Sequence, residues 1–221
     1  SKIDMGIGLN VVAACFGCES IFQYGSEEQK KKWLPPVCAG EMVSAGAFTE
    51  PNAGTDVAGY KTRAVKQGDR YVINGNKMFI TNGTVCDFMV AQCITNPDEK
   101  KHNSFSLIIV PADTPGVTRN KIRGKMGIRS SDTAEIAFED VKVPVTNLVG
   151  KEGKGFYELM HFFDTTRVMV SAQGLGLSEA CLEASVKYCK ERTAFGAPLG
   201  SYQLTQKKLA EMAIMIEALR G

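Results

Sequence analysis

The stretch RYVINGNKMFIT, residues 70–81, decides the fold class of this chain. Two runs rich in β-branched and aromatic residues, Arg70 to Ile73 and Lys77 to Thr81, stand on either side of Asn74-Gly75. An Asn-Gly pair between two such runs is a strong hairpin signal, because both residues accept a positive φ. The stretch therefore predicts two short strands joined by a tight turn.

The same period of two continues on both sides of this stretch, from Glu41 to about Gly150. Further short runs of strand character cover residues 87–94, 105–111 and 135–138, and Gln67-Gly68-Asp69 predicts another turn. Many short strands at nearly regular spacing are typical of a small antiparallel barrel or sandwich. We expect an antiparallel β domain in this part of the chain.

Helical patterns precede the β segment. Residues 6–23 are apolar and small, which favours a buried helix or part of one. Ser26 followed three residues later by Gln29 predicts a capping box at the start of a short charged helix. We expect Leu34-Pro35-Pro36 to end that helix, because proline disfavours helical continuation.

A helical period returns from Gly155 and runs on to Arg192. Residues 194–201 contain two glycines and a proline and predict a loop, and Gln203 to Leu219 predicts a second helix. Two helices joined by a short loop pack antiparallel, but two alone make a poor core. We therefore expect the natural protein to continue beyond Gly221 and to begin before Ser1.

Composition and charge exclude several classes of function. The net charge is +2 and the basic residues are scattered, so we expect neither a nucleic-acid nor a membrane-surface partner. No run approaches the roughly 18–20 apolar residues of a membrane helix. Seven cysteines in apolar surroundings indicate reduced thiols, as in a bacterial cytoplasm or a mitochondrial matrix. Cys15-x-x-Cys18 lacks a second ligand pair, so no metal site is expected.

Three stretches are candidates for ligand binding: residues 48–56 (FTEPNAGTD), residues 78–83 (MFITNG) and residues 192–199 (RTAFGAPL) followed by Gln203. The first is a turn rich in hydroxyls and glycine, whose backbone N–H groups can approach a ligand. Thr81 in the second could present a hydroxyl to a ring nitrogen, and Arg192 suits a phosphate or an adenosine. Considered alone, the first stretch is better explained as a polar turn between strands and the second as a strand that ends in an Asn-Gly turn. Arg192 alone is also compatible with an arginine that bonds the last carbonyls of a helix.

The joint order of these stretches, with a β segment between helical ones, closely resembles the acyl-CoA dehydrogenase family. The resemblance runs nearly end to end and includes residues 130–133 (SSDT), 138–144 (FEDVKVP) and 153–156 (GKGF). It implies an α+β multi-domain fold: the end of an N-terminal helical domain at residues 1–40, an antiparallel β-barrel at 41–151 and the first helices of a four-helix bundle at 152–221.

The resemblance also implies the cofactor, FAD, and the residues that bind it and the acyl-CoA substrate. FAD would lie between the barrel and the bundle, with Thr81 near its N5 and with Phe79 where many members have tryptophan. The expected cofactor-binding residues are Ala47, Phe48, Thr49, Gly54, Thr55, Phe79, Ile80, Thr81 and, toward the FAD of a partner subunit, Arg192, Phe195 and Gln203. The expected substrate-binding residues are Thr55, Phe163, Asp164 and Arg167.

The implied reaction is the α,β-dehydrogenation of an acyl-CoA thioester to a 2-enoyl-CoA, as in fatty acid β-oxidation. A carboxylate would remove the α-proton, the flavin would take the hydride, and an electron-transferring flavoprotein would accept the electrons. The protein would be a homotetramer built as a dimer of dimers.

The general base is missing from the expected catalytic set. One family position for the glutamate is occupied here by Thr166, and the other is expected beyond Gly221, so we expect this chain alone to be inactive. Asp164 is close in sequence, but each helical step turns the side chain by about 100°. Two alternatives stay open, an acyl-CoA oxidase-like flavoenzyme and a non-catalytic module that binds acyl-CoA or flavin.

Overall fold

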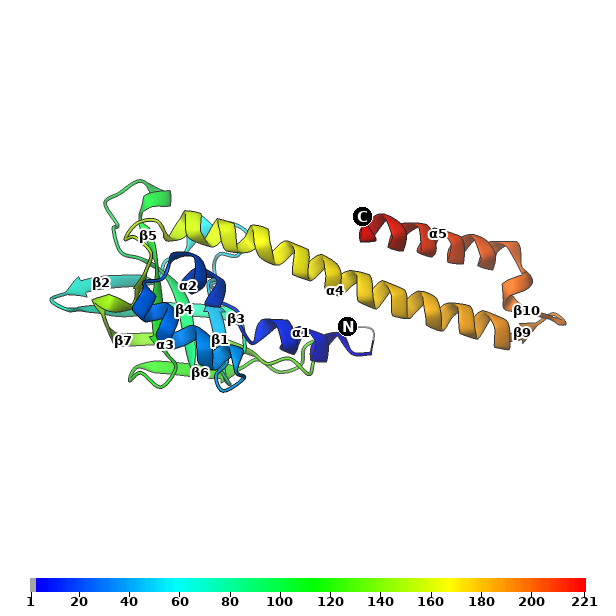
Figure 1. The fold of residues 1–221 in the computed structure, drawn as a ribbon, viewed down its shortest axis with the longest axis horizontal. Helices are drawn as coiled ribbons and strands as arrows, with labels where there is room; N and C mark the ends of the chain where they lie inside the picture. Colours follow the sequence, from blue (N-terminus) through cyan, green and yellow to red (C-terminus); the bar gives the residue numbers. More distant parts are fainter. Residues whose placement is uncertain (1–2) are drawn as a thin grey trace. The chain divides into compact units, whose positions relative to one another are not determined.

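A computed structural model describes residues 3–221 and divides the chain into two compact units, Asn10–Asp164 and Ser1–Leu9 with Thr165–Gly221. Two helices, α1 (Met5–Ala13) and α4 (Gly155–Glu191), run from one unit into the other (Figure 1). The first unit holds an eight-stranded sheet and two short helices. The second holds most of α4, a two-stranded hairpin and helix α5 (Gln203–Arg220).

The sheet of the first unit is mixed. Its order is β6-β7-β3-β2-β4-β5-β8, with β1 pairing beside β4. The strands are β1 (Ser44–Ala47), β2 (Arg63–Gln67), β3 (Arg70–Thr81), β4 (Phe88–Ile94), β5 (Phe105–Pro111), β6 (Val117–Lys121), β7 (Thr133–Pro144) and β8 (Leu148–Val149).

The expected antiparallel barrel is not confirmed. Strand β1 pairs with β4 in parallel over four residues, and β2 meets β4 in parallel at Arg63 and Ile94. Across the described residues, no pairing joins β6 to β8, the two ends of the sheet path. The turn at residues 67–69 between two antiparallel strands was visible in the sequence, whereas the parallel partner of β4 comes from residues far away in the chain, which local patterns do not report.

The Asn74-Gly75 hairpin prediction is wrong, because β3 is one continuous strand of 12 residues. The pair forms a bulge there, where the register against β7 shifts between Ile73 and Gly75. Gly75 has a φ of 148°, and a Cβ atom at that position would lie 2.5 Å from Thr62 Oγ1. The Asn74 amide exchanges two hydrogen bonds with Asp140 on β7. The Gln67-Gly68-Asp69 turn is confirmed, since Gln67 pairs with Arg70.

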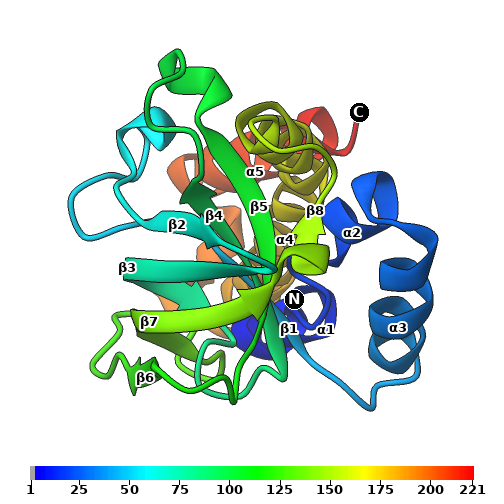
Figure 2. The same ribbon diagram turned by 90° about the vertical axis from the view of Figure 1, so that its left-hand side faces the viewer.

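Helices α2 (Cys18–Tyr24) and α3 (Glu27–Cys38) cover one side of the sheet near β8 and β1 (Figure 2). The capping box is confirmed, with Gln29 N–H donating to Ser26 Oγ and Ser26 N–H donating to Gln29 Oε1. The helix continues through Pro35 and Pro36, so the expected stop is wrong. Both prolines lie in the last turn, where the amides of Ala39 and Glu41 bond back to their carbonyls.

Strands β4 and β5 are buried on both faces, which explains their continuous apolar sequences. Along β4, Met89 and Ala91 face a core between strands, while Phe88 and Val90 face the helices. Trp33 of α3 packs on Phe88 with ring centroids 4.5 Å apart. This double burial makes the centre of the sheet a rigid support for the loops at its edge.

The second unit confirms both expected helices and the loop between them. Between α4 and α5 the chain forms a small antiparallel hairpin, β9 (Thr193–Ala194) with β10 (Ala197–Pro198). The apolar spacing of α5 predicts Leu204, Leu209, Met212, Ile216 and Leu219 as core residues; Ile216 is buried, while the Leu204 side chain is exposed. No helix of the described residues is both long and apolar enough to cross a membrane.

Candidate functional site

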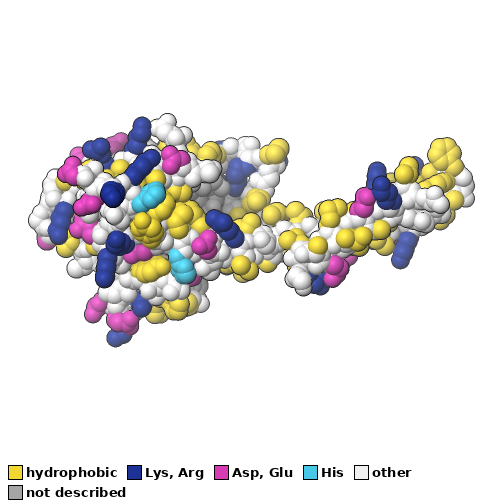
Figure 3. All heavy atoms as spheres, turned by 90° about the horizontal axis from the view of Figure 1, so that it is seen from above, with side chains coloured by type: hydrophobic (Ala, Val, Ile, Leu, Met, Phe, Trp, Pro, Cys, Tyr) yellow, Lys and Arg dark blue, Asp and Glu magenta, His cyan; other side chains and the backbone are white. Residues whose placement is uncertain are grey.

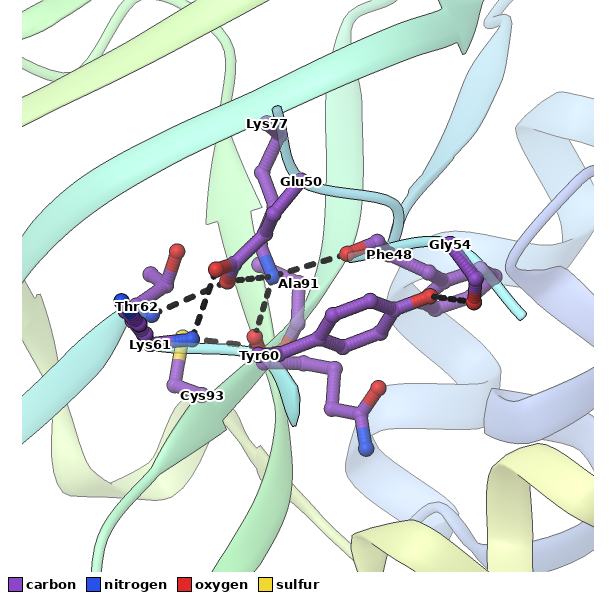
Figure 4. Close-up of polar contacts among 10 residues, drawn as sticks. Phe48, Glu50, Gly54, Tyr60, Lys61, Thr62, Lys77, Ala91 and Cys93 are labelled. Atoms are coloured by element: carbon purple, nitrogen blue, oxygen red, sulfur yellow. Dashed lines mark hydrogen bonds and ion pairs between the residues drawn. The ribbon is translucent and has the colours of Figure 1, made fainter. Parts of the chain in front are cut away.

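A buried ion pair fixes the loop that follows β1 (Figure 4). Lys77, on β3, is fully buried, and its Nζ lies 2.9 Å from Glu50 Oε1. The same ammonium group donates to the carbonyl oxygens of Phe48 (3.0 Å) and Gln92 (2.8 Å). Three acceptors match the three N–H groups of a charged lysine, whereas a neutral amine has only two. The lysine is therefore held in its ammonium form between the loop and the sheet.

The carboxylate of Glu50 is satisfied by the backbone on the far side of the loop. Its oxygens accept from the amides of Lys61 (2.6 Å) and Thr62 (2.9 Å). Burial by itself raises the pKa of Glu50, but Lys77 and these hydrogen bonds outweigh it and leave the pKa below its ordinary value. Burial holds the pKa of Lys77 below its ordinary value although Glu50 opposes that shift, so it is the three hydrogen-bond acceptors around Nζ that favour the ammonium form. Glu50 thus ties both ends of the segment 48–62 together.

The ring of Tyr60 closes the loop from the other side. Its centroid lies 5.0 Å from Lys77 Nζ, and its hydroxyl donates to the Gly54 carbonyl at 3.2 Å. Glu50 and Ala53 exchange two backbone hydrogen bonds, which makes a tight turn around Pro51 and Asn52. As a result, Gly54 and Thr55 are exposed on a loop whose base is rigid.

A second bulge in β3 brings the loop and the strand together. The register between β3 and β7 shifts between Lys77 and Ile80, and Phe79 has a φ of 60°. The Met78 amide, freed from the β7 ladder, donates to the Thr49 carbonyl at 2.8 Å. A positive φ is costly for an aromatic residue, by about 1–2 kcal/mol, and such strain concentrates at functional sites. The two candidate stretches 48–56 and 78–83 therefore meet at one edge of the sheet.

The expected residues at this edge differ in what they can offer a ligand. The Phe79 ring is 66% exposed, and Thr49 and Thr81 are half-buried. In contrast, the Ala47 and Ile80 side chains lie in the core between strands, so they could offer only backbone groups. Phe48 is also buried, where its ring meets those of Phe162 and Phe163 at 5.4 and 6.1 Å.

Asn82 anchors the end of β3, although its role was not visible in the sequence. It has a φ of 63° and is buried. Its amide nitrogen donates to the carbonyls of Ala13 (2.7 Å) and Ser44 (3.2 Å), which belong to α1 and β1. This side chain holds Thr81 next to the start of β1. The Asn-Gly pair at 82–83 was interpreted only as a turn.

The expected substrate residues fall in different units. Phe163 and Asp164 belong to the sheet unit, whereas Thr166 and Arg167 belong to the helical one. Asp164 and Arg167 are exposed and Thr166 is half-buried. Within the sheet unit, Phe163 contacts Phe48 of the candidate site, and Thr55 lies on the exposed part of its loop.

The remaining expected residues lie around the hairpin of the helical unit. Arg192 directly follows α4, and its carbonyl accepts from the Leu199 amide, which closes the hairpin. Phe195 is fully exposed at the tip, with φ values of 50° at Phe195 and 80° at Gly196. The Tyr202 hydroxyl donates to the Ala194 carbonyl, and Gln203 begins α5 with an exposed side chain. The hairpin thus presents an exposed aromatic ring on a rigid turn.

Among residues 3–221, no group of three or more His, Cys, Asp or Glu side chains could hold a metal ion. Lysine, arginine, aspartate and glutamate are interspersed on the face of the sheet unit seen in Figure 3. What sequence reasoning missed is the buried pair Lys77–Glu50 and the bulge at Met78. A lysine inside an apolar strand was the available signal for the pair.

Models of three successive domains match the chain: the N-terminal domain of acyl-CoA dehydrogenases at residues 1–41, the middle domain at 45–141 and the C-terminal domain at 153–221. The chain belongs to the acyl-CoA dehydrogenase family, whose members are FAD-dependent oxidoreductases.

Similar proteins support this assignment. A short-chain-specific acyl-CoA dehydrogenase of Megasphaera elsdenii is 43% identical over all of this chain and 58% of its own length. A chain solved in work on the electron transferring flavoprotein of Acidaminococcus fermentans has a TM-score of 0.95 at 43% identity, covering 99% of this chain and 57% of that one. A glutaryl-CoA dehydrogenase from Mycobacterium smegmatis in complex with FADH2 has a TM-score of 0.86 at 34% identity, covering 92% and 51%. The chain thus spans about half the length of such relatives.

Proposed function

We propose that the protein of which this chain forms part is an FAD-dependent acyl-CoA dehydrogenase, which converts an acyl-CoA thioester into a 2-enoyl-CoA. Residues 1–40 would end its N-terminal helical domain, residues 41–151 would be its middle β domain and residues 152–221 would begin its C-terminal helical bundle. The family membership supports the reaction class, and the relatives named for acyl-CoA substrates support the substrate class.

The hydrogen bond from the Met78 amide to the Thr49 carbonyl carries the proposal within this chain. It joins two stretches that are far apart in sequence, so that Phe79, Thr81 and Thr49 share one edge of the sheet. An exposed aromatic ring held at a positive φ, beside two hydroxyl-bearing residues, fits the flat ring system of a flavin. Thr81 would face the flavin, and Phe79 and the backbone of Ile80 would flank it.

The loop 47–55 would hold the flavin and the thioester. Its backbone groups at Ala47 and Phe48, the Thr49 hydroxyl and the exposed Gly54 and Thr55 are placed by the Glu50–Lys77 pair. The bound FAD would supply hydride acceptance. The polar groups of the loop would orient the thioester and stabilise negative charge on its oxygen, which acidifies the α-proton. Phe163, Asp164 and Arg167 would contact the substrate.

Membership of the family also supports a proposal for the oligomeric state and for the electron acceptor. Arg192, Phe195 and Gln203 would contact the FAD of a neighbouring subunit, so the functional unit would be a homo-oligomer, a dimer of dimers. An electron-transferring flavoprotein would take the electrons. The exposed tip of the hairpin, with the Phe195 ring fully accessible, supports a role between subunits.

A second candidate function is a non-catalytic module that binds flavin or acyl-CoA. Thr166 favours it, because a hydroxyl has the wrong proton affinity to abstract an α-proton near neutral pH. Only the first candidate function includes turnover of acyl-CoA. Both could include flavin binding at the same place, the edge of the sheet formed by Thr49, Phe79 and Thr81, which we call the flavin edge.

The experiment that tests the flavin edge is a titration of the purified chain with FAD, followed by visible absorbance. We expect the flavin spectrum to shift on binding and Thr81→Val to reduce that shift. The matched control is Thr118→Val, which removes a hydroxyl from an exposed position on β6. An equal spectral shift in wild type and Thr81→Val would contradict the proposed role of Thr81.

A further inference from the structure

A pocket of about 580 Å³ lies in the sheet unit between the end of α2 and the start of α4, and its lining includes none of Thr49, Phe79 and Thr81. It is lined by Gln23, Tyr24, Gly150, Lys151, Lys154, Tyr157 and Glu158. A volume of this size suits a small ligand. None of these residues has a role in the proposed dehydrogenation.

A buried carboxyl group forms part of the pocket wall. Glu158, in the first turn of α4, is only 6% exposed. Its Oε1 accepts a long hydrogen bond from the Lys151 amide at 3.4 Å, and its Oε2 is buried without a protein hydrogen-bond partner. Gly150, at a φ of 66°, passes so close that a Cβ there would overlap Glu158 Oε1. A buried, half-satisfied carboxyl group is unusual, because protein interiors satisfy almost all polar atoms.

The charge around this carboxyl group favours an anion. Two lysines, Lys151 and Lys154, border the pocket, and the side chains of both are exposed. Burial raises the pKa of Glu158 to about 7, so the group is partly neutral near neutral pH. With Glu158 protonated, the pocket carries two positive charges and an O–H donor. An oxyanion would be attracted by the two lysines and would accept a hydrogen bond from the O–H group, whereas a cation would be repelled by the lysines.

The rest of the lining favours a ligand with a flat apolar part. Tyr24 comes from α2 and Tyr157 from α4, and Lys154 Nζ lies 5.9 Å from the Tyr157 ring centroid. Aromatic walls contact flat apolar groups over a large area. The pocket is also larger than an inorganic ion requires.

We propose that this pocket binds a small organic oxyanion with a flat apolar body, and that Glu158 takes up a proton from solvent when the ligand binds. The neutral carboxyl group donates a hydrogen bond to the ligand oxygen, and Lys151 and Lys154 balance the ligand charge. The proposal does not depend on flavin binding or on dehydrogenase activity.

Several other ionisable groups face this region and must be separated from Glu158. They are Glu19 and Tyr24 on α2, Lys151 and Lys154 in the loop before α4, and Tyr157 and His161 on α4. The Tyr24 and His161 rings lie 6.2 Å apart. Because histidine side chains in general change charge between pH 5 and 8, His161→Gln is the necessary control.

Benzoate is the probe, since its charge is constant between pH 6 and 8, and binding to the 221-residue chain is measured by calorimetry. Benzoate binds only when Glu158 is protonated, and the protonated fraction falls about tenfold from pH 6 to pH 8. The apparent Kd for benzoate should therefore rise about tenfold over that range. Glu158→Gln keeps a neutral donor and should bind benzoate with the same Kd at both pH values. Lys151→Met with Lys154→Met should lose binding at both, and His161→Gln should keep the wild-type pH dependence.

Two further arms complete the test. Competition by sulfate would show that charge alone is recognised and would contradict the need for an apolar body; no competition by sulfate supports it. Calorimetry of the wild type at pH 7 in two buffers of different ionisation enthalpy should show proton uptake, whether or not Glu158→Gln folds. Absence of saturable benzoate binding at pH 6, or a tenfold pH effect that persists in Glu158→Gln, would overturn the proposal.

Discussion

At the scale of single residues, Lys77 explains why a polar loop can be held rigidly over an apolar sheet. Its ammonium group links the carbonyls of Phe48 and Gln92 to the carboxylate of Glu50, all inside the protein. Removing one partner of such a pair leaves the other charge buried and uncompensated. That loss typically costs about 3–5 kcal/mol, far more than an exposed pair contributes.

We therefore expect Lys77→Met to lower the free energy of unfolding by roughly 3–5 kcal/mol, measured by urea denaturation. Adding Glu50→Gln should recover part of the loss, because the double variant has no unpaired buried charge. Lys66→Met, at an exposed position on β2, is the control and should change stability little. A cost below about 1 kcal/mol for Lys77→Met would mean that the pair does not hold the loop.

Glu158 makes stability depend on pH in the direction opposite to that of most carboxylates. Its ordinary pKa is 4.5, and the folded protein raises it to about 7. As the pH rises from 4.5 to 7, the unfolded chain loses this proton while the folded chain keeps it, so folding becomes less favourable. The expected loss is roughly 3 kcal/mol, complete above pH 7.

Urea denaturation at pH 5 and pH 8 measures this pH-dependent loss of folding stability. The wild type should lose more stability between the two pH values than Glu158→Gln, whose amide does not titrate. Glu139→Gln, which replaces an exposed carboxylate in the middle of β7, should behave like the wild type. Identical pH dependence in wild type and Glu158→Gln would refute the assignment.

At the scale of elements, the two bulges of β3 determine where the candidate site lies. The first, at Asn74-Gly75, needs glycine for two reasons, a φ of 148° and the contact with Thr62. The second, at Met78-Phe79, releases the Met78 amide toward Thr49. Both interrupt the pairing with β7, and between them Lys77 points into the core.

Gly75→Ala should therefore destabilise the protein by roughly 3 kcal/mol or more, from backbone strain and from the clash with Thr62. Gly68→Ala is the matched control. Its φ of 60° lies in the left-handed region, which residues other than glycine enter at modest cost, and nothing lies within 4 Å of the added Cβ, so a loss of about 1 kcal/mol is expected. Equal losses in thermal or urea unfolding would show that the contact with Thr62 is unimportant.

The order of helical, β and helical segments could be predicted from periodicity, and so could the capping box of α3 and the turn at residues 67–69. The continuity of β3 could not, because Asn-Gly is as suitable for a bulge as for a hairpin, and only pairing with β7 decides between them. Parallel pairing of β1 with β4 and the burial of Lys77 depend on residues distant in the chain. For the candidate site, the stretches were found from motif order, but their meeting point at Met78 and Thr49 was not.

At the scale of the whole molecule, the main prediction is that the 221-residue chain has a flavin-binding edge but no general base for the α-proton. The resemblance to the family implies that Thr166 occupies an alternative base position, and Asp164 is two residues away on the same helix, rotated by about 200°. We expect the 221-residue chain with FAD, short and medium acyl-CoAs and an artificial electron acceptor to show no turnover above a control without protein. Turnover above that control would contradict this and make Asp164→Asn the first variant to test.

The assembly provides a second test at this scale. If the hairpin reaches the FAD of a neighbouring subunit, Phe195→Ala in the full-length protein should weaken FAD binding and subunit association together. Phe22→Ala, which removes an exposed ring from α2, is the control and should affect neither. Analytical ultracentrifugation of the flavin-loaded variants separates the outcomes; an intact oligomer with unchanged FAD content in Phe195→Ala would contradict the role of the hairpin.

If Thr49 and Met78 join two stretches into one flavin-binding edge, NMR should detect FAD at both stretches. The backbone amide shifts of the isotope-labelled chain are measured during addition of FAD. We expect the largest changes to fall within residues 47–55 and 78–82 and to leave β6 around Thr118 unaffected. Saturable FAD binding with its largest changes outside these two stretches would contradict this expectation.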